Sequence, residues 1–310
     1  MKRFVLSLAA LAGLAAAQTI VVNEAYTGTP DWIEIINLGP CAQNMGGYKV
    51  YWGCDSSGSF QSGFVTLPGT LTLAPGQVAV ITDSNPPTLP AVPGGVFIIY
   101  VGANILWANA NGTGGNGVAT VVDPSGAGVD TLRWGNPTQT LNFGSPWSGT
   151  APLLNLGFIR QGNIDTNSAL NWVNQSGSLP LTAGAINVGQ SPLSSMPLTL
   201  STAGGGQFTF ALSTLCPPSP FGEIFNLISL VDTVPDGSGP FFGLATDVLP
   251  EALTAADAFN PFHTYLDANG QYVLAVPSGI LPVGLHFECV SLLVAAPFIS
   301  RVSTLATITL

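Results

Sequence analysis

The sequence predicts an all-β protein that contains two successive β-sandwiches, over residues 18–190 and 198–310. Short runs of β-branched and aromatic residues alternate with turn-forming clusters, and the 310 residues include 37 Gly and 25 Pro. This spacing is typical of many short strands joined by turns. One segment, 250–258, predicts a helix, with Pro250 in its first turn and Asp247 upstream. The predicted fold class is therefore all-β.

The first element is a predicted secretory signal peptide over residues 1–17. Lys2 and Arg3 precede an apolar run over 4–14, and Ala15 to Ala17 provide small residues for cleavage. The run is shorter than the ~20 apolar residues that span a membrane. No cysteine stands at the cleavage point to accept a lipid. We expect a mature chain that begins at Gln18, is secreted or lies at the cell surface, and has no membrane span.

Residues after the signal peptide predict the strands of the first sandwich. Ile20–Tyr26 is rich in β-branched residues, Gly28 to Pro30 favour a turn, and a second strand reaches Asn37.

These strands carry the pattern of a known family. Asn23-Glu24 in the first strand and Asp31 to Glu34 in the second resemble the start of the lamin tail domain, an immunoglobulin-like β-sandwich also found in secreted bacterial proteins. Residues 73–81 look like the family's Pro-Gly turn and following strand, and 118–123 with 129–135 look like its late hairpin. Further similar segments are 157–160, 165–167, Trp172 and 182–187. Ala183 stands where the family usually has Pro. The resemblance covers about residues 19–190 and implies an immunoglobulin-like β-sandwich.

One segment of the first domain, 85–116, matches nothing in the family. We interpret it as a loop insertion that carries a single strand at 96–101, and an insertion of this length is a place where function is often located.

The second domain is predicted over residues 198–310, after a Ser- and Pro-rich linker at 191–197. This length is sufficient for a small sandwich with a core of its own. Its Gly-rich run and its turn at Asp267 to Gly270 are similar to C-terminal β-domains of secreted bacterial proteins. The predicted strands are 197–201, 207–213, 223–231, 272–277, 285–294 and 302–310.

The mature chain is strongly acidic, which excludes nucleic acid as a partner. The full sequence has 6 Lys and Arg against 16 Asp and Glu, and two of the basic residues lie in the signal peptide, so 4 − 16 gives a net charge of −12. Binding to a phosphate backbone requires clusters of basic residues. Only Lys49, Arg133, Arg160 and Arg301 remain, so a chromatin role like that discussed for lamin tail domains is not expected here.

The four cysteines predict disulfides, because their number is even and the chain is expected in an oxidising compartment. Three pairings are possible. We favour Cys41 with Cys54 and Cys216 with Cys289, since each pair then lies inside one domain. Thiols remain an alternative if the protein is exported reduced, and no Cys-x-x-Cys motif or nearby His supports a metal site.

The common hydrolase motifs are absent from the sequence: it has neither Gly-x-Ser-x-Gly nor His-Glu-x-x-His. Residues 112–117 fit the spacing Gly-x-Gly-x-x-Gly but precede a predicted strand, so there is no helix N-terminus for a pyrophosphate. His263 and His286 are the only histidines, and His286, beside Phe287 in a predicted strand, is interpreted as packed or solvated.

Glu24 and Glu34 are predicted to be neighbours across the first hairpin, where a glycosidase would need two carboxylates at a defined separation. We favour a structural role for this pair, with Arg160 as an available partner. No catalytic residue is assigned, and the chain is predicted not to be an enzyme.

Four tryptophans near turns and loops are candidate ligand contacts: Trp52, Trp107, Trp134 and Trp147. Exposed aromatic rings on a rigid β-scaffold stack on sugars or on apolar groups of a partner. Burial in the sandwich core is the alternative for each of them.

Asx-rich turns at 83–85, 165–167 and 267–269 offer oxygen ligands to calcium, but none completes a twelve-residue calcium loop. Such turns need no ion. No metal and no other cofactor is predicted.

Together these patterns predict a secreted, non-enzymatic structural or adhesive protein at the cell surface or in the extracellular matrix, with an extracellular protein or polysaccharide as its partner. The alternative is a carbohydrate-binding accessory module that uses the loop tryptophans. A third possibility is an enzyme on the second domain, which would need His263 or His286 beside a carboxylate and a nucleophile in one cleft.

Overall fold

The computed structural model describes residues 20–54, 61, 63–83, 96–105, 116–135, 140–149, 156–163, 165–174, 181–248, 260–295 and 298–310. Across these residues the chain is built of strands, with one short 3₁₀ turn, η2 (Ala169–Asn171). The predicted all-β sandwich class is therefore confirmed. The predicted signal peptide, the helix at 250–258, Trp107 and much of the 85–116 insertion lie outside the described residues.

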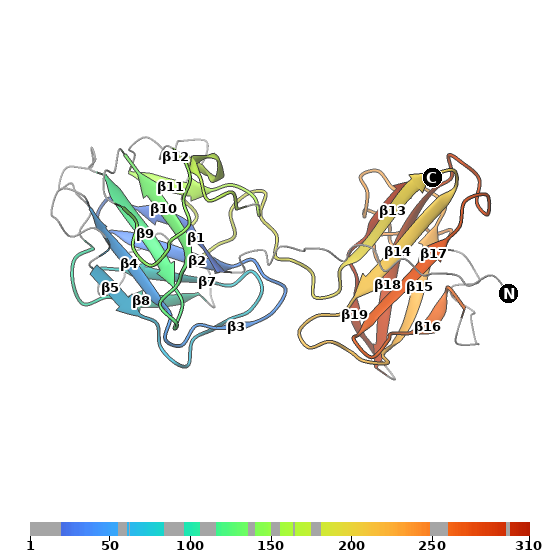
Figure 1. The fold of residues 1–310 in the computed structure, drawn as a ribbon, viewed down its shortest axis with the longest axis horizontal. Coiled ribbons are helices and arrows are strands. Elements are labelled where there is room, and N and C mark those ends of the chain that lie inside the picture. Colours follow the sequence, from blue (N-terminus) through green and yellow to red (C-terminus); the bar gives the residue numbers. More distant parts are fainter. Residues whose placement is uncertain are drawn as a thin grey trace. The chain divides into compact units, whose positions relative to one another are not determined.

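The chain divides into two compact units, here called unit 1 (Met1–Pro192) and unit 2 (Leu193–Leu310). The division falls at the start of the Ser- and Pro-rich segment 191–197. Each unit contains two facing β-sheets (Figure 1).

Unit 1 has a six-stranded sheet and a four-stranded sheet. The six-stranded sheet is antiparallel except for its edge strand β8, which runs parallel to β7. A short pair, β3 (Gln43–Asn44) with β6 (Thr72–Leu73), lies outside both sheets. The six-stranded order is β12 (Trp172–Asn174), β11 (Gly157–Arg160), β1 (Ile20–Tyr26), β2 (Trp32–Asn37), β7 (Val78–Thr82) and β8 (Phe97–Tyr100). The four-stranded order is β10 (Gly128–Trp134), β9 (Gly117–Val122), β4 (Lys49–Cys54) and β5 (Gly63–Thr66).

The core of unit 1 lies between these two sheets. Strands β1 and β2 are buried on both faces, because one face meets the opposite sheet and the other is covered by residues 181–190. The core side includes Ile33, Val50, Trp134 and Phe158, and the last two rings lie 5.1 Å apart. A bulge between Val22 and Glu24 shifts the register of β1 against β2.

Unit 2 is a smaller sandwich. One sheet has the order β13 (Leu198–Gly204), β14 (Gln207–Ser213) and β17 (Gln271–Val276). The other has the order β16 (His263–Tyr265), β15 (Glu223–Ser229), β18 (His286–Ala295) and β19 (Phe298–Val302), and β20 (Ala306–Thr309) also pairs with β18.

Strand β18 shows how the alternation of a strand divides its side chains between two cores. Phe287 and Cys289 face the other sheet, where Phe287 packs edge-on against Phe208. Val290 and Leu292 lie in a second cluster with Leu244. That cluster lies on the outer face of the sheet, which the segment after β15 covers. His286 and Glu288 have the same even-numbered spacing in β18 as Val290 and Leu292, so they lie on this outer face too.

Candidate functional site

Two of the four candidate tryptophans are buried, so the prediction that they contact a ligand is wrong. Trp52 is 5% exposed and Trp134 is 1% exposed. Trp52 lies opposite Gly63 and Trp134 opposite Gly117 in the strand register. Each indole folds over its glycine, at which a Cβ would come within 2.3 Å of Trp52 or 2.1 Å of Trp134. The missing side chain makes room for the ring inside the sandwich.

Trp147 is half-buried rather than displayed on a loop. It packs against the core of unit 1, and its Nε1 donates to the carbonyl oxygen of Gly149 at 3.3 Å. Of the three candidate tryptophans that lie in the described part of the chain, only Trp147 is accessible to a ligand, and only in part.

The predicted cysteine pairings are also wrong. Cys41 and Cys216 are disulfide-bonded, whereas Cys54 and Cys289 are buried thiols. Cys41 lies in the loop after β2, and Cys54 is the last residue of β4. Because a strand advances ~3.3 Å per residue, β4 places Cys54 far from that loop. A disulfide needs Cα atoms within about 7 Å. Cys289 faces the core of unit 2, and its burial raises the pKa of its thiol.

Glu24 and Glu34 face each other across β1 and β2, and both are buried. Their partners come from residues 181–190, here called the closing segment. The backbone N and the hydroxyl of Thr182 donate to Glu24 at 3.0 and 2.8 Å, and the backbone N of Gly184 donates to Glu34. The two carboxyls are therefore enclosed by protein donors and not presented to a substrate.

Burial controls the titration of this pair. It raises the pKa of Glu24 from 4.5 to about 7, against the opposing hydrogen bonds from Thr182. It also raises the pKa of Glu34 well above its usual value, and the nearby Glu24 carboxylate adds to that rise. Two amides complete the cluster, since Asn187 and Gln190 of the closing segment both donate to Asn23 Oδ1, at 3.1 and 2.8 Å.

Arg160 does not pair with the two glutamates as expected. Its side chain is fully buried and forms ion pairs with Asp130 and, at 3.3 Å, with Asp165. It also donates to the backbone oxygen of Val22 at 2.7 Å and stacks over the ring of Trp172. Burial raises the pKa of Asp130 to about 6, and the Arg160 charge opposes this rise.

The Asx-rich turns use their carboxylates internally. Asp165 accepts from the backbone N of Asn167 at 2.8 Å and contacts Arg160. Asp267 Oδ1 accepts from the backbone N of Asn269 and of Gln271, at 2.8 and 2.9 Å. Asp83 accepts from the backbone N of Asp31 at 3.1 Å, and the rest of that turn, 84–85, lies outside the described residues.

An open depression of about 550 Å³ lies beside the end of β11. Amide side chains of Gln161, Asn163 and Asn171 line it, together with the exposed Leu170. Its described lining includes no aromatic ring on which a sugar would stack.

Unit 2 displays a second surface feature, a loop over residues 230–244 that we call the apolar loop. Five of its aliphatic and aromatic side chains are exposed, including Val234 at 88% and Phe242 at 43%. The five are Leu230, Val231, Val234, Phe241 and Phe242.

The apolar loop is fixed by hydrogen bonds at its base and near its end. The backbone N and hydroxyl of Thr233 donate to the buried carboxylate of Glu288 at 3.1 and 3.0 Å. Asp247 accepts from the hydroxyl of Ser229 at 2.6 Å. Gly239 pairs with Gly243 in a tight turn that presents the two phenylalanines. The loop therefore holds apolar side chains in water on an ordered backbone.

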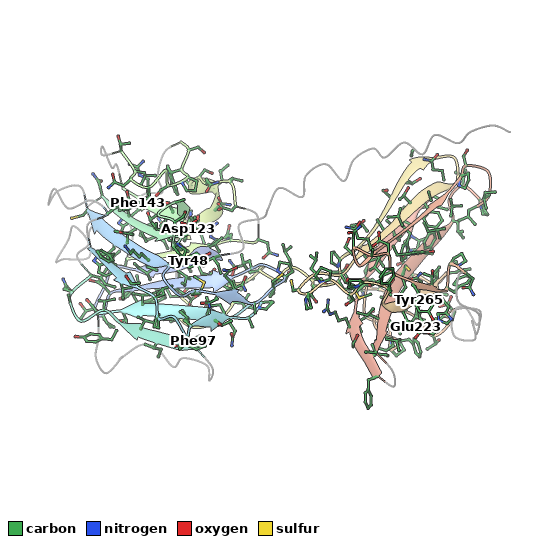
Figure 2. The ribbon with its side chains drawn as sticks, turned by 60° about the horizontal axis from the view of Figure 1, so that its bottom comes forward. Tyr48, Phe97, Asp123, Phe143, Glu223 and Tyr265 are labelled. Carbon is green, nitrogen blue, oxygen red and sulfur yellow. The ribbon has the colours of Figure 1, made fainter. Side chains whose placement is uncertain are left out.

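The two histidines occupy different environments. His263 is buried, stacks on Phe225 with ring centroids 4.2 Å apart, and contacts Glu223 at 2.7 Å. Glu223 lies on β15 opposite Tyr265 of β16 (Figure 2). His263 is therefore packed in the strand pair.

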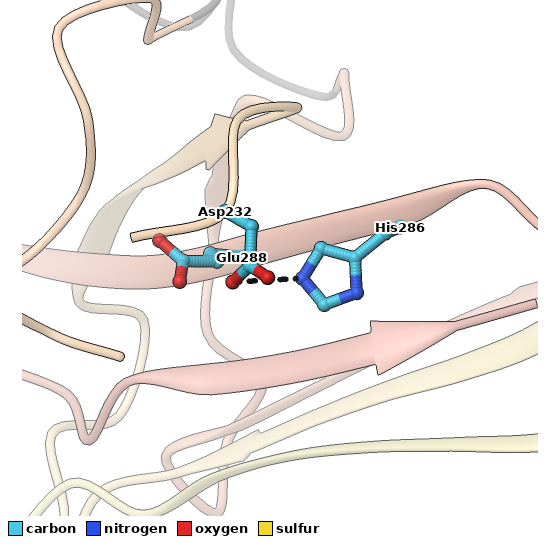
Figure 3. Close-up of side chains that lie close together, drawn as sticks. All are labelled: Asp232, His286 and Glu288. Carbon is cyan, nitrogen blue, oxygen red and sulfur yellow. Dashed lines mark ion pairs between the residues drawn. The ribbon is translucent and has the colours of Figure 1, made fainter. Parts of the chain in front are cut away.

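His286 lies beside the base of the apolar loop with two carboxylates. Its Nε2 faces Asp232 of the loop at 3.5 Å, and Glu288 lies two residues further along β18 (Figure 3). Its Nδ1 lies 2.9 Å from the hydroxyl of Thr309 on β20. No sequence motif connects Asp232 to the other two residues, although His-Phe-Glu in a strand places His286 and Glu288 on one face.

Comparisons with known proteins do not assign the chain to a family. No family model and no curated protein matches the sequence. One solved structure, the native conformation of E. coli alpha-2-macroglobulin, aligns with 13% identity and a TM-score of 0.18 over 93% of this chain. The chain spans 20% of the length of that protein, and a TM-score this low does not establish a shared fold. Among the described residues, no helix is long and apolar enough to cross a membrane.

Proposed function

We propose that this chain is a secreted, non-enzymatic adhesive protein that binds another extracellular protein through the apolar loop of unit 2. The observation that carries the proposal is the exposure of Val234, Phe241 and Phe242 on a loop whose backbone is held by Glu288 and Asp247. The rings of Phe241 and Phe242 lie 5.6 Å apart, and apolar groups that gather in water on an ordered surface mark protein contacts. A fixed loop also loses little conformational entropy when it binds.

The rest of the chain supports an extracellular role. The lamin-tail-like pattern of residues 19–190, the signal-peptide pattern of 1–17 and the disulfide-bonded Cys41 and Cys216 all suit export to an oxidising compartment. Unit 1 then serves as a rigid scaffold.

The chemistry of unit 1 supports a role without catalysis. The Glu24 and Glu34 carboxyls, which are the best placed pair for acid and base chemistry, are saturated by donors from the closing segment and Asn23. A glycosidase pair has to face a bound sugar across a gap.

The test measures how well beads coated with the mature chain, residues 18–310, are retained on cells of the producing organism. Beads that carry the wild-type chain are compared with beads that carry variants. The double variant Val234→Ser with Phe242→Ser removes apolar surface from the loop. A matched control, Phe64→Ser with Val188→Ser, removes two exposed apolar side chains of similar type and exposure from unit 1. We expect the loop variant to lose retention and the control to keep it.

Treatment of the cells separates the partner classes. Protease treatment removes retention if the partner is a protein, whereas glycosidase treatment removes it if the partner is a polysaccharide. Retention that survives in the loop variant would refute the assignment of the apolar loop.

The carbohydrate alternative is favoured by a different observation, the amide-lined depression beside β11. Asn163→Ala tests it, because amide side chains provide the hydrogen bonds that orient sugar hydroxyls. Glycan binding that is lost in Asn163→Ala and kept in the loop variant would replace the adhesive proposal.

A further inference from the structure

We propose that Asp232, His286 and Glu288 of unit 2 form a binding site for one divalent transition-metal ion, with Zn²⁺ as the best match. Each residue offers one ligand atom, and the three atoms lie within 4.8 Å of one another. This inference stands apart from the adhesive function, because it depends on ligand geometry and not on what the loop contacts.

The fold brings the three side chains together by simple strand geometry. His286 and Glu288 are two residues apart in β18, so both project from the outer face of the sheet. The register Ser229↔Glu288 places the end of β15 beside Glu288, and the chain then turns into the apolar loop that carries Asp232. Figure 3 shows the Asp232 carboxylate between the His286 ring, with which it is ion-paired, and the carboxylate of Glu288.

The orientation of the His286 ring favours metal binding at Nε2. The register His286↔Thr309 places the Thr309 hydroxyl 2.9 Å from Nδ1, on the neighbouring strand. A metal-binding imidazole commonly donates its other N–H to such a neighbour, which fixes the tautomer and the ring plane. With the proton on Nδ1, the lone pair of Nε2 points toward the two carboxylates.

Nε2 also lacks a hydrogen bond where one would be expected. The atom is buried and has no hydrogen-bond partner in the described part of the chain. Asp232 Oδ1, at 3.5 Å, is too distant for a good hydrogen bond. A buried nitrogen in this state calls for an explanation, and a metal ion between the ring and the carboxylates provides one.

The charges of the site match a divalent cation. Asp232 and Glu288 provide two carboxyl groups, and Glu288 is fully buried, with the Thr233 donors as its described hydrogen-bond partners. The only basic residue of Leu193–Leu310 is Arg301, whose side chain donates to the Leu215 carbonyl. The same segment contains eight acidic residues: Glu223, Asp232, Asp236, Asp247, Glu251, Asp257, Asp267 and Glu288. An excess of negative charge raises the local concentration of cations.

The donor set selects the class of metal. Ca²⁺ prefers six to eight oxygen ligands, whereas imidazole suits Zn²⁺ and its first-row neighbours. Three protein ligands leave a position for water in a tetrahedral Zn²⁺ site. Asp232, whose side chain is 57% exposed, leaves that position open to solvent.

The test is calorimetric titration of the mature chain with Zn²⁺, in buffer without chelator and with excess Ca²⁺ as competitor. Asp232→Asn removes the negative charge of one ligand and keeps its shape, and His286→Gln removes the imidazole ligand. The matched control is Asp236→Asn, which removes an exposed carboxylate from the same loop outside the cluster. Glu288 is left intact because it anchors Thr233.

We expect one Zn²⁺ per chain, no displacement by Ca²⁺, a loss of affinity of about tenfold or more in each ligand variant, and no change in Asp236→Asn. Zn²⁺ should also raise the melting temperature of unit 2 in the wild type and not in His286→Gln. The absence of binding, equal binding by wild type and His286→Gln, or an equal loss in the control would overturn the proposal.

Discussion

The buried carboxyl of Glu24 predicts that unit 1 loses stability as the pH rises from about 4.5 to 8.5. The pKa of Glu24 is about 7 in the folded chain against 4.5 when exposed. The folded state therefore binds this proton more tightly than the unfolded state does. The resulting stabilisation is fully present at low pH and is lost as the pH rises through the folded pKa.

The size of the loss follows from the pKa difference. A difference of 2.5 pKa units at about 1.4 kcal/mol each predicts a fall of about 3 kcal/mol in the unfolding free energy over this range. Asp31, with a pKa raised to about 8, and Asp130, with a pKa raised to about 6, add to the fall with the same sign. Glu24 and Glu34 titrate as a coupled pair, so the part of the fall assigned to Glu24 belongs to both carboxyls.

The variant Glu24→Gln removes one carboxyl of this pair. Its amide oxygen still accepts from Thr182, but the side chain no longer ionises. We expect the pH dependence to become shallower by about 3 kcal/mol between pH 4.5 and 8.5. Asp123→Asn is the control, because hydrogen bonds in its exposed turn lower the pKa of Asp123, so that it titrates below this range.

The measurement is urea unfolding followed by tryptophan fluorescence at a series of pH values. All six tryptophans lie within residues 32–172, so the signal reports unit 1 alone. An unfolding free energy that stays constant or rises with pH would refute the reasoning. So would a Glu24→Gln variant that keeps the wild-type slope.

Three further outcomes follow from the contacts of the core. Arg160→Ala leaves the buried Asp130 carboxylate without its cation and should cost unit 1 about 3–5 kcal/mol in the same unfolding assay, whereas a loss below 1 kcal/mol would contradict the buried ion pair. Trp134→Ala should cost about 3–5 kcal/mol, since it empties the space above Gly117, and no loss would mean that the indole is not packed there. In the absence of reductant, a thiol reagent should modify no cysteine of the folded chain and only Cys54 and Cys289 of the denatured chain. Four reactive thiols in the denatured, unreduced chain would contradict the disulfide.

The local signals in the sequence predicted the strands well, for identifiable reasons. The β-branched runs at β1 and β2, the Pro-Gly turn before β7 and the Pro124 to Gly126 turn between β9 and β10 are each contained in a few neighbouring residues. The predicted strand at 96–101 corresponds to β8. Residues 250–258 lie outside the description, so the helix stays a prediction.

The contacts between distant residues could not be predicted in the same way. Whether a tryptophan in a strand is exposed depends on its cross-strand neighbour, and Gly117 opposite Trp134 is visible only once the register is known. The Arg160 partner and the cysteine pairing depend on how the loops fold back, which spacing alone does not fix. For His286, the alternation of β18 placed Glu288 on the same face, but Asp232 comes from a loop.

The closing segment determines where unit 1 can be cut. A truncation after residue 180 would retain β1 to β12, yet it would remove the donors of Thr182 and Gly184 from two enclosed carboxyls and the amides of Asn187 and Gln190 from Asn23. Enclosed polar groups that lose their partners are costly. An expression boundary chosen from the strands alone would therefore yield an unstable fragment, whereas one placed after Gln190 keeps all of these donors.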